Sequence, residues 1–107
     1  MRDGLTGLRN RRFFDQQARE LFGRAARSGR PLAVMLGDLD IFKDVNDRLS
    51  HKTGDRVLRE VSDILRRRVR GADVVARYGG EEFAIVFPDT TLQQAQGVCA
   101  GTISRMT

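Results

Sequence analysis

Residues 77–83 read Arg-Tyr-Gly-Gly-Glu-Glu-Phe (RYGGEEF), and this stretch decides how the chain folds. Strand-forming apolar residues lie on either side of it, in VVA at 74–76 and in AIVF at 84–87. Two such runs around a Gly-Gly pair predict a β-hairpin. Glycine weakens a strand and adjacent carboxylates repel each other, so strand packing alone does not account for the two glycines and two glutamates at its centre. The pattern predicts a hairpin whose tip carries a function.

The chain before the hairpin alternates between helical and strand patterns. Apolar residues at helical spacing predict a helix over about 11–28. Gly29-Arg30-Pro31 ends that helix, and LAVMLGDLD at 32–40 predicts a short buried strand that ends in acidic residues. Residues 42–55 predict a short helix and a loop.

A second long helix is predicted from Thr53 to Val69 by its apolar stripe. Strands over 74–78 and 82–87 follow, and a final helix, capped by Thr90 or Thr91, is expected to run to near Met106. This order of elements implies an α/β sandwich with an antiparallel hairpin in its sheet.

Composition indicates one soluble domain. The chain has 107 residues, 40% of them hydrophobic and 31% charged. We expect a cytoplasmic domain without membrane contact, because no apolar run approaches membrane-spanning length and the N-terminus does not resemble a signal peptide. The single Cys99 excludes an internal disulfide and suits a reducing compartment.

The net charge of +5 comes from 17 arginines and only two lysines. Such a balance fits nucleic acid, an anionic membrane surface or a phosphate-bearing small molecule. No aromatic residues alternate with the densest patch, Arg66 to Arg70, as a single-strand binding face requires. The charge therefore favours a solvated surface, and nucleic-acid binding is the weakest of the functions considered.

Two pairs of carboxylates predict a cation site. Asp38 and Asp40 share one face of their strand, and Glu81 and Glu82 lie at the hairpin tip. If the hairpin lies beside that strand, Asp38 and Glu81 can hold one divalent cation together with phosphate oxygens. Taken singly, a strand-end aspartate is more often a helix cap and an acidic tip a solvated turn. Together, with glycines beside them, they favour a phosphate-handling site.

Three motifs give the chain a family resemblance. RYGGEEF at 77–83, DLDIFKDVNDRLSHKTGD at 38–55 and DGLTGLRNRRFF at 3–14 together resemble the GGDEF domain of bacterial diguanylate cyclases, over essentially the whole chain. The resemblance implies a palm-like nucleotide-cyclase sandwich, with a central, mainly antiparallel sheet flanked by helices. It also implies the condensation of two GTP molecules into cyclic di-GMP and two pyrophosphates, between two such domains that face each other as a homodimer.

The resemblance also assigns catalytic and metal roles. Asp38, the backbone carbonyl of Leu39 and Glu81 match the Mg²⁺ ligands of the family, with Mn²⁺ as an alternative ion. Glu81 matches the residue that helps to deprotonate the attacking 3′-hydroxyl, and Glu82 assists the metals. Lys43 matches a phosphate-side cation that would stabilise the transition state, although a merely solvated lysine is the alternative.

The substrate contacts follow from the same comparison. Asn46 and Asp55 match the residues that hydrogen-bond guanine, against the alternatives of a turn former and a helix cap. Phe42 lies in the same motif, where a core anchor is the favoured alternative to a nucleotide contact. Gly79 and Gly80 match the glycines that let the main chain approach the nucleotide.

A second site is implied upstream of the hairpin. Arg70 and Asp73, in RGAD, end five residues before Gly79, at the offset of the family's inhibitory product site. Arginine can donate two hydrogen bonds to guanine, and aspartate can accept from its amino edge. A surface salt bridge is the alternative.

Two departures qualify the resemblance. Ser50 stands where the family commonly has glycine, and the sequence ends at Thr107, before the final strands and helix that family members carry. We therefore expect a fragment, residues 1–107, of a larger signalling protein, active as a cyclase in that protein and weak or inactive alone. The alternative function is a non-catalytic module that binds GTP or cyclic di-GMP and signals to an attached domain.

Overall fold

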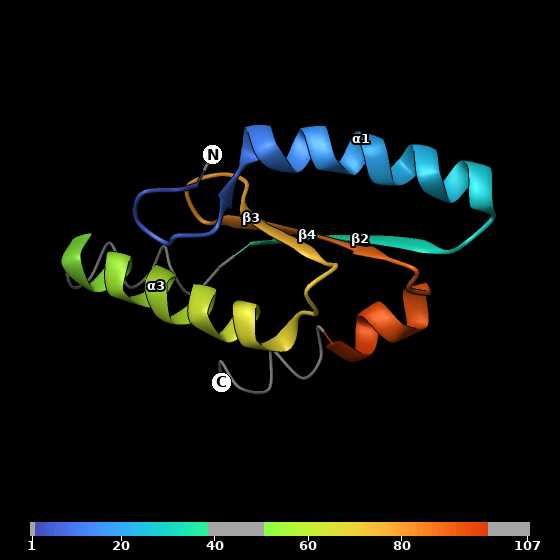
Figure 1. The fold of residues 1–107 in the computed structure, drawn as a ribbon. Coiled ribbons are helices and arrows are strands. Elements are labelled where there is room, and N and C mark those ends of the chain that lie inside the picture. The colour runs from blue at the N-terminus through green and yellow to red at the C-terminus, as the bar shows by residue number, and fades with distance from the viewer. Residues whose placement is uncertain (1, 39–50, 99–107) are drawn as a thin grey trace.

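Helices pack on both faces of a four-stranded sheet. The computed structural model describes residues 2–38 and 51–98. Its elements are β1 (Arg9–Asn10), α1 (Arg11–Ser28), β2 (Leu32–Asp38), α3 (His51–Arg68), β3 (Val74–Arg77) and β4 (Glu82–Pro88). A short helix follows over 92–98. Figure 1 shows α1 along one face of the sheet and α3 along the other.

The predicted hairpin forms the centre of this sheet, whose strand order is β1-β3-β4-β2. β4 pairs antiparallel with both β3 and β2, whereas β1 pairs parallel with β3. The sheet is therefore mainly antiparallel and flanked by helices, which confirms the predicted fold class. The two-residue strand β1 is an addition, because so short a strand leaves no periodic pattern in the sequence.

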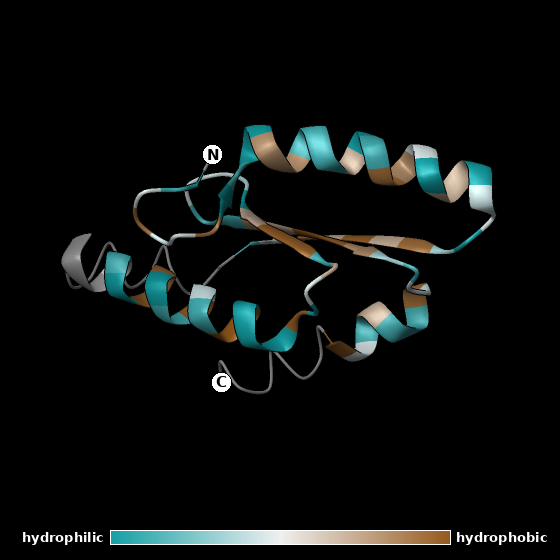
Figure 2. Cartoon of the chain, in the orientation of Figure 1, coloured by the Kyte–Doolittle hydropathy of each residue, from teal (hydrophilic) through white to brown (hydrophobic). Residues whose placement is uncertain are grey.

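Alternation along β4 creates a separate core on each face. Phe83, Ile85 and Phe87 point into a core with Leu58 and other residues of α3. The intervening Ala84 and Val86 pack instead in the cluster that contains Phe14 of α1. Figure 2 shows apolar residues concentrated on the strands and hydrophilic ones along the outer sides of the helices.

Local capping explains why α1 has the predicted bounds. The Asn10 side chain accepts a hydrogen bond from the Phe13 backbone N–H at 2.9 Å, which satisfies a donor that the first turn leaves free. At the other end Gly29 adopts φ 73° and donates its N–H to Ala25 at 2.9 Å. Glycine reaches this left-handed conformation without a Cβ penalty, so the helix ends there.

Two predicted elements need correction. α3 begins at His51, two residues before the predicted start, so residues 51–55 are helical rather than part of a loop. Asp55 therefore lies inside the helix and does not cap it. β2 is only partly buried: Val34 and Leu36 are 41% and 66% exposed, because these alternate side chains face away from the α3 core.

The start of the final helix agrees with the prediction. Thr91 Oγ1 accepts from the Gln94 N–H at 3.2 Å, and Gln94 Oε1 accepts from the Thr91 N–H at 2.9 Å. This reciprocal pair is a capping box, which marks the helix N-terminus at Thr91. No helix in the described ranges is long and apolar enough to cross a membrane.

Candidate metal and nucleotide site at the β3–β4 turn

The antiparallel register brings two predicted carboxylates together. Asp38, the last residue of β2, lies directly opposite Glu82, the first residue of β4, whereas the sequence analysis paired Asp38 with Glu81. Residues opposite each other share a face of the sheet, and like charges in that position destabilise it. Both residues are exposed at the sheet end, and Glu81 precedes Glu82 at the close of the turn. The strands thus concentrate negative charge at one point.

This donor set fits a hard divalent cation. Carboxylate oxygens are the ligands that Mg²⁺ prefers, and it commonly uses only one or two of them alongside phosphate oxygens and water. Over the described residues no group of three or more acidic, histidine or cysteine side chains is placed to hold a metal. Two opposed carboxylates are enough for an ion whose remaining ligands are phosphate oxygens and water.

Hydrogen bonds of the main chain define the turn itself. The N–H groups of Tyr78 and Gly79 both donate to the Glu82 carbonyl, at 2.8 and 3.3 Å. The Arg77 guanidinium also donates to the Gly80 carbonyl, through Nη2 at 2.9 Å and through Nε at 3.2 Å. Both glycines therefore form a main-chain hydrogen bond, Gly79 through its N–H and Gly80 through its carbonyl.

The two glycines are required for different reasons. A Cβ built on Gly79 would lie 3.2 Å from Cδ of Glu82 and 3.4 Å from its Oε1, closer than ordinary contacts. A Cβ on Gly80 meets no atom of the described chain within 4 Å. Gly79 thus makes room for the Glu82 side chain, whereas Gly80 leaves open space outside the turn. The sequence analysis assigned both glycines only the role of leaving space for a nucleotide beside the main chain.

Asp3 and Arg77 form an ion pair that sequence reasoning did not identify. Arg77 Nη1 lies 3.3 Å from both carboxylate oxygens of Asp3, and the two side chains are only 20% and 22% exposed. Partial burial by itself would raise the pKa of Asp3. The net effect is nevertheless a lowered pKa of Asp3, because other interactions outweigh the burial. These are hydrogen bonds from the backbone and hydroxyl of Thr6, and the charge and hydrogen bond of Arg77.

The other predicted site residues divide into two groups. Asp55 lies half-buried in the second turn of α3. In Figure 1 the beginning of α3 lies at the same end of the molecule as the β3–β4 turn. Leu39, Phe42, Lys43 and Asn46 lie outside the described residues, so their roles stay predictions.

Arg70 and Asp73 form a separate cluster before β3. The Arg70 guanidinium donates to Asp73 Oδ1 at 3.1 Å, to the Pro88 carbonyl at 2.9 Å and to the Thr90 hydroxyl at 2.6 Å. The Asp73 carboxylate also accepts the Arg70 backbone N–H at 2.8 Å, and its side chain is 2% exposed. The salt bridge therefore exists, and all of β3 separates it from the turn.

A small cavity adjoins this cluster. Its volume is about 230 Å³, and Arg68, Arg70, Asp73 and Thr90 are among the residues that line it. Nε of Arg68 is buried and has no hydrogen-bond partner in the described structure. Arg68 thus contributes to the cavity wall and also carries a buried donor without a partner among the described residues.

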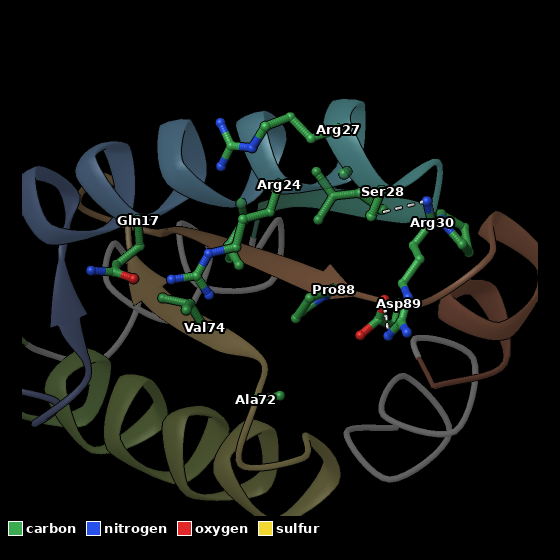
Figure 3. Close-up of a pocket in the computed structure, with 13 residues that line it drawn as sticks. Gln17, Arg24, Arg27, Ser28, Arg30, Ala72, Val74, Pro88 and Asp89 are labelled. Atoms are coloured by element: carbon green, nitrogen blue, oxygen red, sulfur yellow. Dashed lines mark hydrogen bonds and ion pairs between the residues drawn. The ribbon is translucent and has the colours of Figure 1, made fainter.

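A roomier cavity lies away from the turn, between α1 and the ends of three strands. It measures about 760 Å³ and is lined by Leu21, Arg24, Leu32, Val74 and Pro88, among others. Figure 3 shows Arg24 extending from α1 across it, with Arg30 and Asp89 paired at its edge. Leu32 and Val74 begin their strands and Pro88 ends β4, so this cavity is at the opposite end of the sheet from Asp38 and Glu82.

Comparison with curated proteins gives two close relatives. The chain is 47% identical over 93 residues to the response regulator PleD of Caulobacter vibrioides, covering 87% of the chain and 20% of PleD. It is 45% identical over 89 residues to the diguanylate cyclase DosC of Escherichia coli strain K12, covering 83% of the chain and 19% of DosC. The chain thus spans about a fifth of the length of these relatives.

Solved structures give the same fold. The diguanylate cyclase SiaD of Pseudomonas aeruginosa, crystallised with its activator SiaC, superposes with a TM-score of 0.89 and 42% identity over 94% of this chain and 39% of SiaD. The GGDEF domain of DgcB from Caulobacter crescentus, in complex with c-di-GMP, gives a TM-score of 0.85 and 37% identity over 98% of this chain and 59% of that one.

The family comparison covers the whole sequence. The family model described as "Diguanylate cyclase, GGDEF domain" matches residues 1–107. The hairpin and the layered fold agree with this match. The chain belongs to the GGDEF domain family of diguanylate cyclases.

Proposed function

We propose that this domain condenses two GTP molecules into cyclic di-GMP with release of two pyrophosphates. Two copies would face each other, each presenting one GTP, in the cytoplasm and within a longer signalling protein. The observation that carries the proposal is the opposition of Asp38 and Glu82 beside the Gly79-Gly80 turn. Membership of the diguanylate cyclase family supports it.

Asp38, Glu81 and the backbone carbonyl of Leu39 would hold Mg²⁺ or Mn²⁺. The ion, when bound, supplies positive charge to the leaving pyrophosphate and to the attacking oxygen. Glu81 would accept the proton of the 3′-hydroxyl, and Glu82 would add negative charge next to the ion. The open space outside Gly80 supports close approach of the nucleotide to the main chain.

The remaining contacts of the nucleotide would come from both sides of the turn. Asn46 and Asp55 would hydrogen-bond the guanine, and the position of Asp55 in α3 near this end of the sheet supports its part. Lys43 would neutralise phosphate charge as the bond to pyrophosphate breaks. Phe42 would contact the nucleotide or, as the alternative, anchor the motif in the core.

We further propose that cyclic di-GMP inhibits the enzyme at Arg70 and Asp73. The adjoining cavity, lined by Arg68, Arg70 and Asp73 among others, supports a polar ligand there. The Arg70 side chain is 58% exposed, so its guanidinium would bond guanine on one side while it holds Asp73 on the other. A relative, the DgcB domain, is described in complex with c-di-GMP.

The test is a turnover assay on the full-length protein that carries this domain. Purified protein freed of bound nucleotide is incubated with GTP and Mg²⁺, and the product is identified by mass. We expect cyclic di-GMP and pyrophosphate in a 1:2 ratio, no product when the divalent ion is chelated, and a rate that rises more than linearly with protein concentration. Binding of GTP without turnover would instead support the non-catalytic module.

A further inference from the structure

Arg77 connects two parts of the chain that lie far apart in sequence. Its Nη1 contacts the Asp3 carboxylate at 3.3 Å, and its Nη2 and Nε donate to the Gly80 carbonyl at 2.9 and 3.2 Å. All three nitrogens of the guanidinium are therefore engaged. Because the guanidinium is rigid and planar, the position of Asp3 determines where the Gly80 carbonyl is held.

Asp3 is itself fixed by a compact N-terminal turn. Its carboxylate accepts from the Thr6 N–H at 2.9 Å and from the Thr6 hydroxyl at 2.8 Å. Its backbone bonds to Leu8 at 2.7 Å and to Gly7 at 2.9 Å. Arg66 of α3 also donates to the Thr6 carbonyl, so the turn is fastened to the body of the domain.

The bond to Gly80 does not belong to the sheet ladder or to either core. Arg77 is the last residue of β3, and its backbone pairs with Phe83 regardless of its side chain. Gly80 lies one residue before Glu81 and two before Glu82, which faces Asp38. Glu82 is held separately by its place in the β4 ladder and by the Tyr78 and Gly79 N–H groups. A movement of the Gly80 peptide would therefore displace Glu81, the next residue, and leave the hydrophobic packing intact.

We propose that Arg77 is a positioning residue for cyclic di-GMP synthesis. It clamps the Gly80 peptide and so holds Glu81 in place beside Glu82 and Asp38, and Asp3 orients the clamp. The inference rests on the proposed function. It assigns no contact between Arg77 and GTP, because its donors are already used within the domain.

The test compares Arg77→Gln and Asp3→Asn with a matched control, Arg30→Gln, in the full-length protein. Arg30 forms an exposed pair with Asp89 at 3.6 Å, at the opposite end of the sheet. We expect Arg77→Gln to lower kcat by about tenfold or more with the KM for GTP little changed, because a displacement of about 1 Å at reacting groups can cost a hundredfold. Arg30→Gln should keep the wild-type kcat.

A double mutant tests whether Asp3 acts through Arg77. Asp3→Asn should lower kcat in the same direction, and the double variant should be no slower than Arg77→Gln alone, since the two residues form one unit. Additive losses would contradict the clamp. So would an Arg77→Gln protein whose kcat lies within twofold of wild type, or one whose loss disappears when activity is corrected for the folded fraction.

Amide hydrogen exchange gives a readout that does not need turnover. We expect peptides that cover residues 78–81 to exchange faster in Arg77→Gln, while peptides from α1 and from residues 83–88 of β4 keep their protection. If the wild type makes no cyclic di-GMP, the proposed function fails. Unchanged exchange at 78–81 overturns the clamp itself, and faster exchange with normal kcat overturns its role in the reaction.

Discussion

At the scale of single residues, the turn between β3 and β4 places a different demand on each of its glycines. Gly79 lies against the Glu82 side chain, and Gly80 faces open space. Neither glycine has a positive φ. Backbone strain therefore selects glycine at neither position, and only at Gly79 does a neighbouring side chain limit the space for a Cβ.

Alanine substitutions separate these two demands. Gly79→Ala should displace the Glu82 carboxylate and reduce turnover even when GTP is saturating. Gly80→Ala should instead raise the KM for GTP, because its methyl group enters only the space left for the nucleotide. Initial rates over a range of GTP concentrations distinguish the two. Identical kinetic defects in both variants would contradict this division.

Asp3 links stability to pH. Its pKa lies below the ordinary 3.8 in the folded chain, so its stabilising contribution is complete above that value and is lost as the pH falls through the lowered pKa. Asp3→Asn should therefore reduce the free energy of unfolding by about 1–2 kcal/mol at pH 7, and by progressively less below pH 3.8.

Denaturant unfolding at several pH values measures this difference. Asp63→Asn is the control, because the exposed Asp63–Arg66 pair should contribute little at any pH. A destabilisation by Asp3→Asn that stays constant into strong acid would show that packing, not charge, is responsible.

At the scale of elements, the caps decide where the helices begin. Asn10 accepts a hydrogen bond from the first turn of α1. It also belongs to β1, where it pairs with Arg77 of β3. Asn10→Ala should cost about 1 kcal/mol of unfolding free energy through the lost cap. Asn10→Ser should recover most of it, as thermal unfolding would show. Equal losses for alanine and serine would place the effect in β1 instead.

The sequence was informative where periodicity and turn chemistry were strong. The bounds of α1 and the β3–β4 hairpin agree with the structure because Gly29 and the Gly-Gly pair are unambiguous signals. β1 and the early start of α3 were missed, since two residues carry no period and the polar first turn of α3 resembles a loop. The Asp3–Arg77 pair was missed because its members are 74 residues apart.

At the scale of the whole molecule, the two predicted nucleotide sites lie at opposite ends of β3. Arg70 and Asp73 precede β3, whereas Glu81 follows it. Arg70→Ala should weaken cyclic di-GMP binding about tenfold or more, because it removes charge-assisted hydrogen bonds, and should leave the initial rate nearly intact. Glu81→Gln should stop synthesis and leave product binding in place.

Calorimetry with cyclic di-GMP tests both variants of the full-length protein. Arg70 also bonds Pro88 and Thr90, so thermal unfolding of Arg70→Ala must be measured alongside. Equal affinities of wild type and Arg70→Ala would reduce the RGAD cluster to a structural salt bridge.

The measurement that tests the central claim most directly is the initial rate of cyclic di-GMP formation by Asp38→Asn in the full-length protein. The substitution removes one of two opposed carboxylates at nearly constant volume, with Asp63→Asn as the matched control. We predict that Asp38→Asn loses at least about a hundredfold in rate, because several kcal/mol of metal stabilisation depend on it, while its fold and thermal stability persist. A rate near that of the wild type would contradict the account.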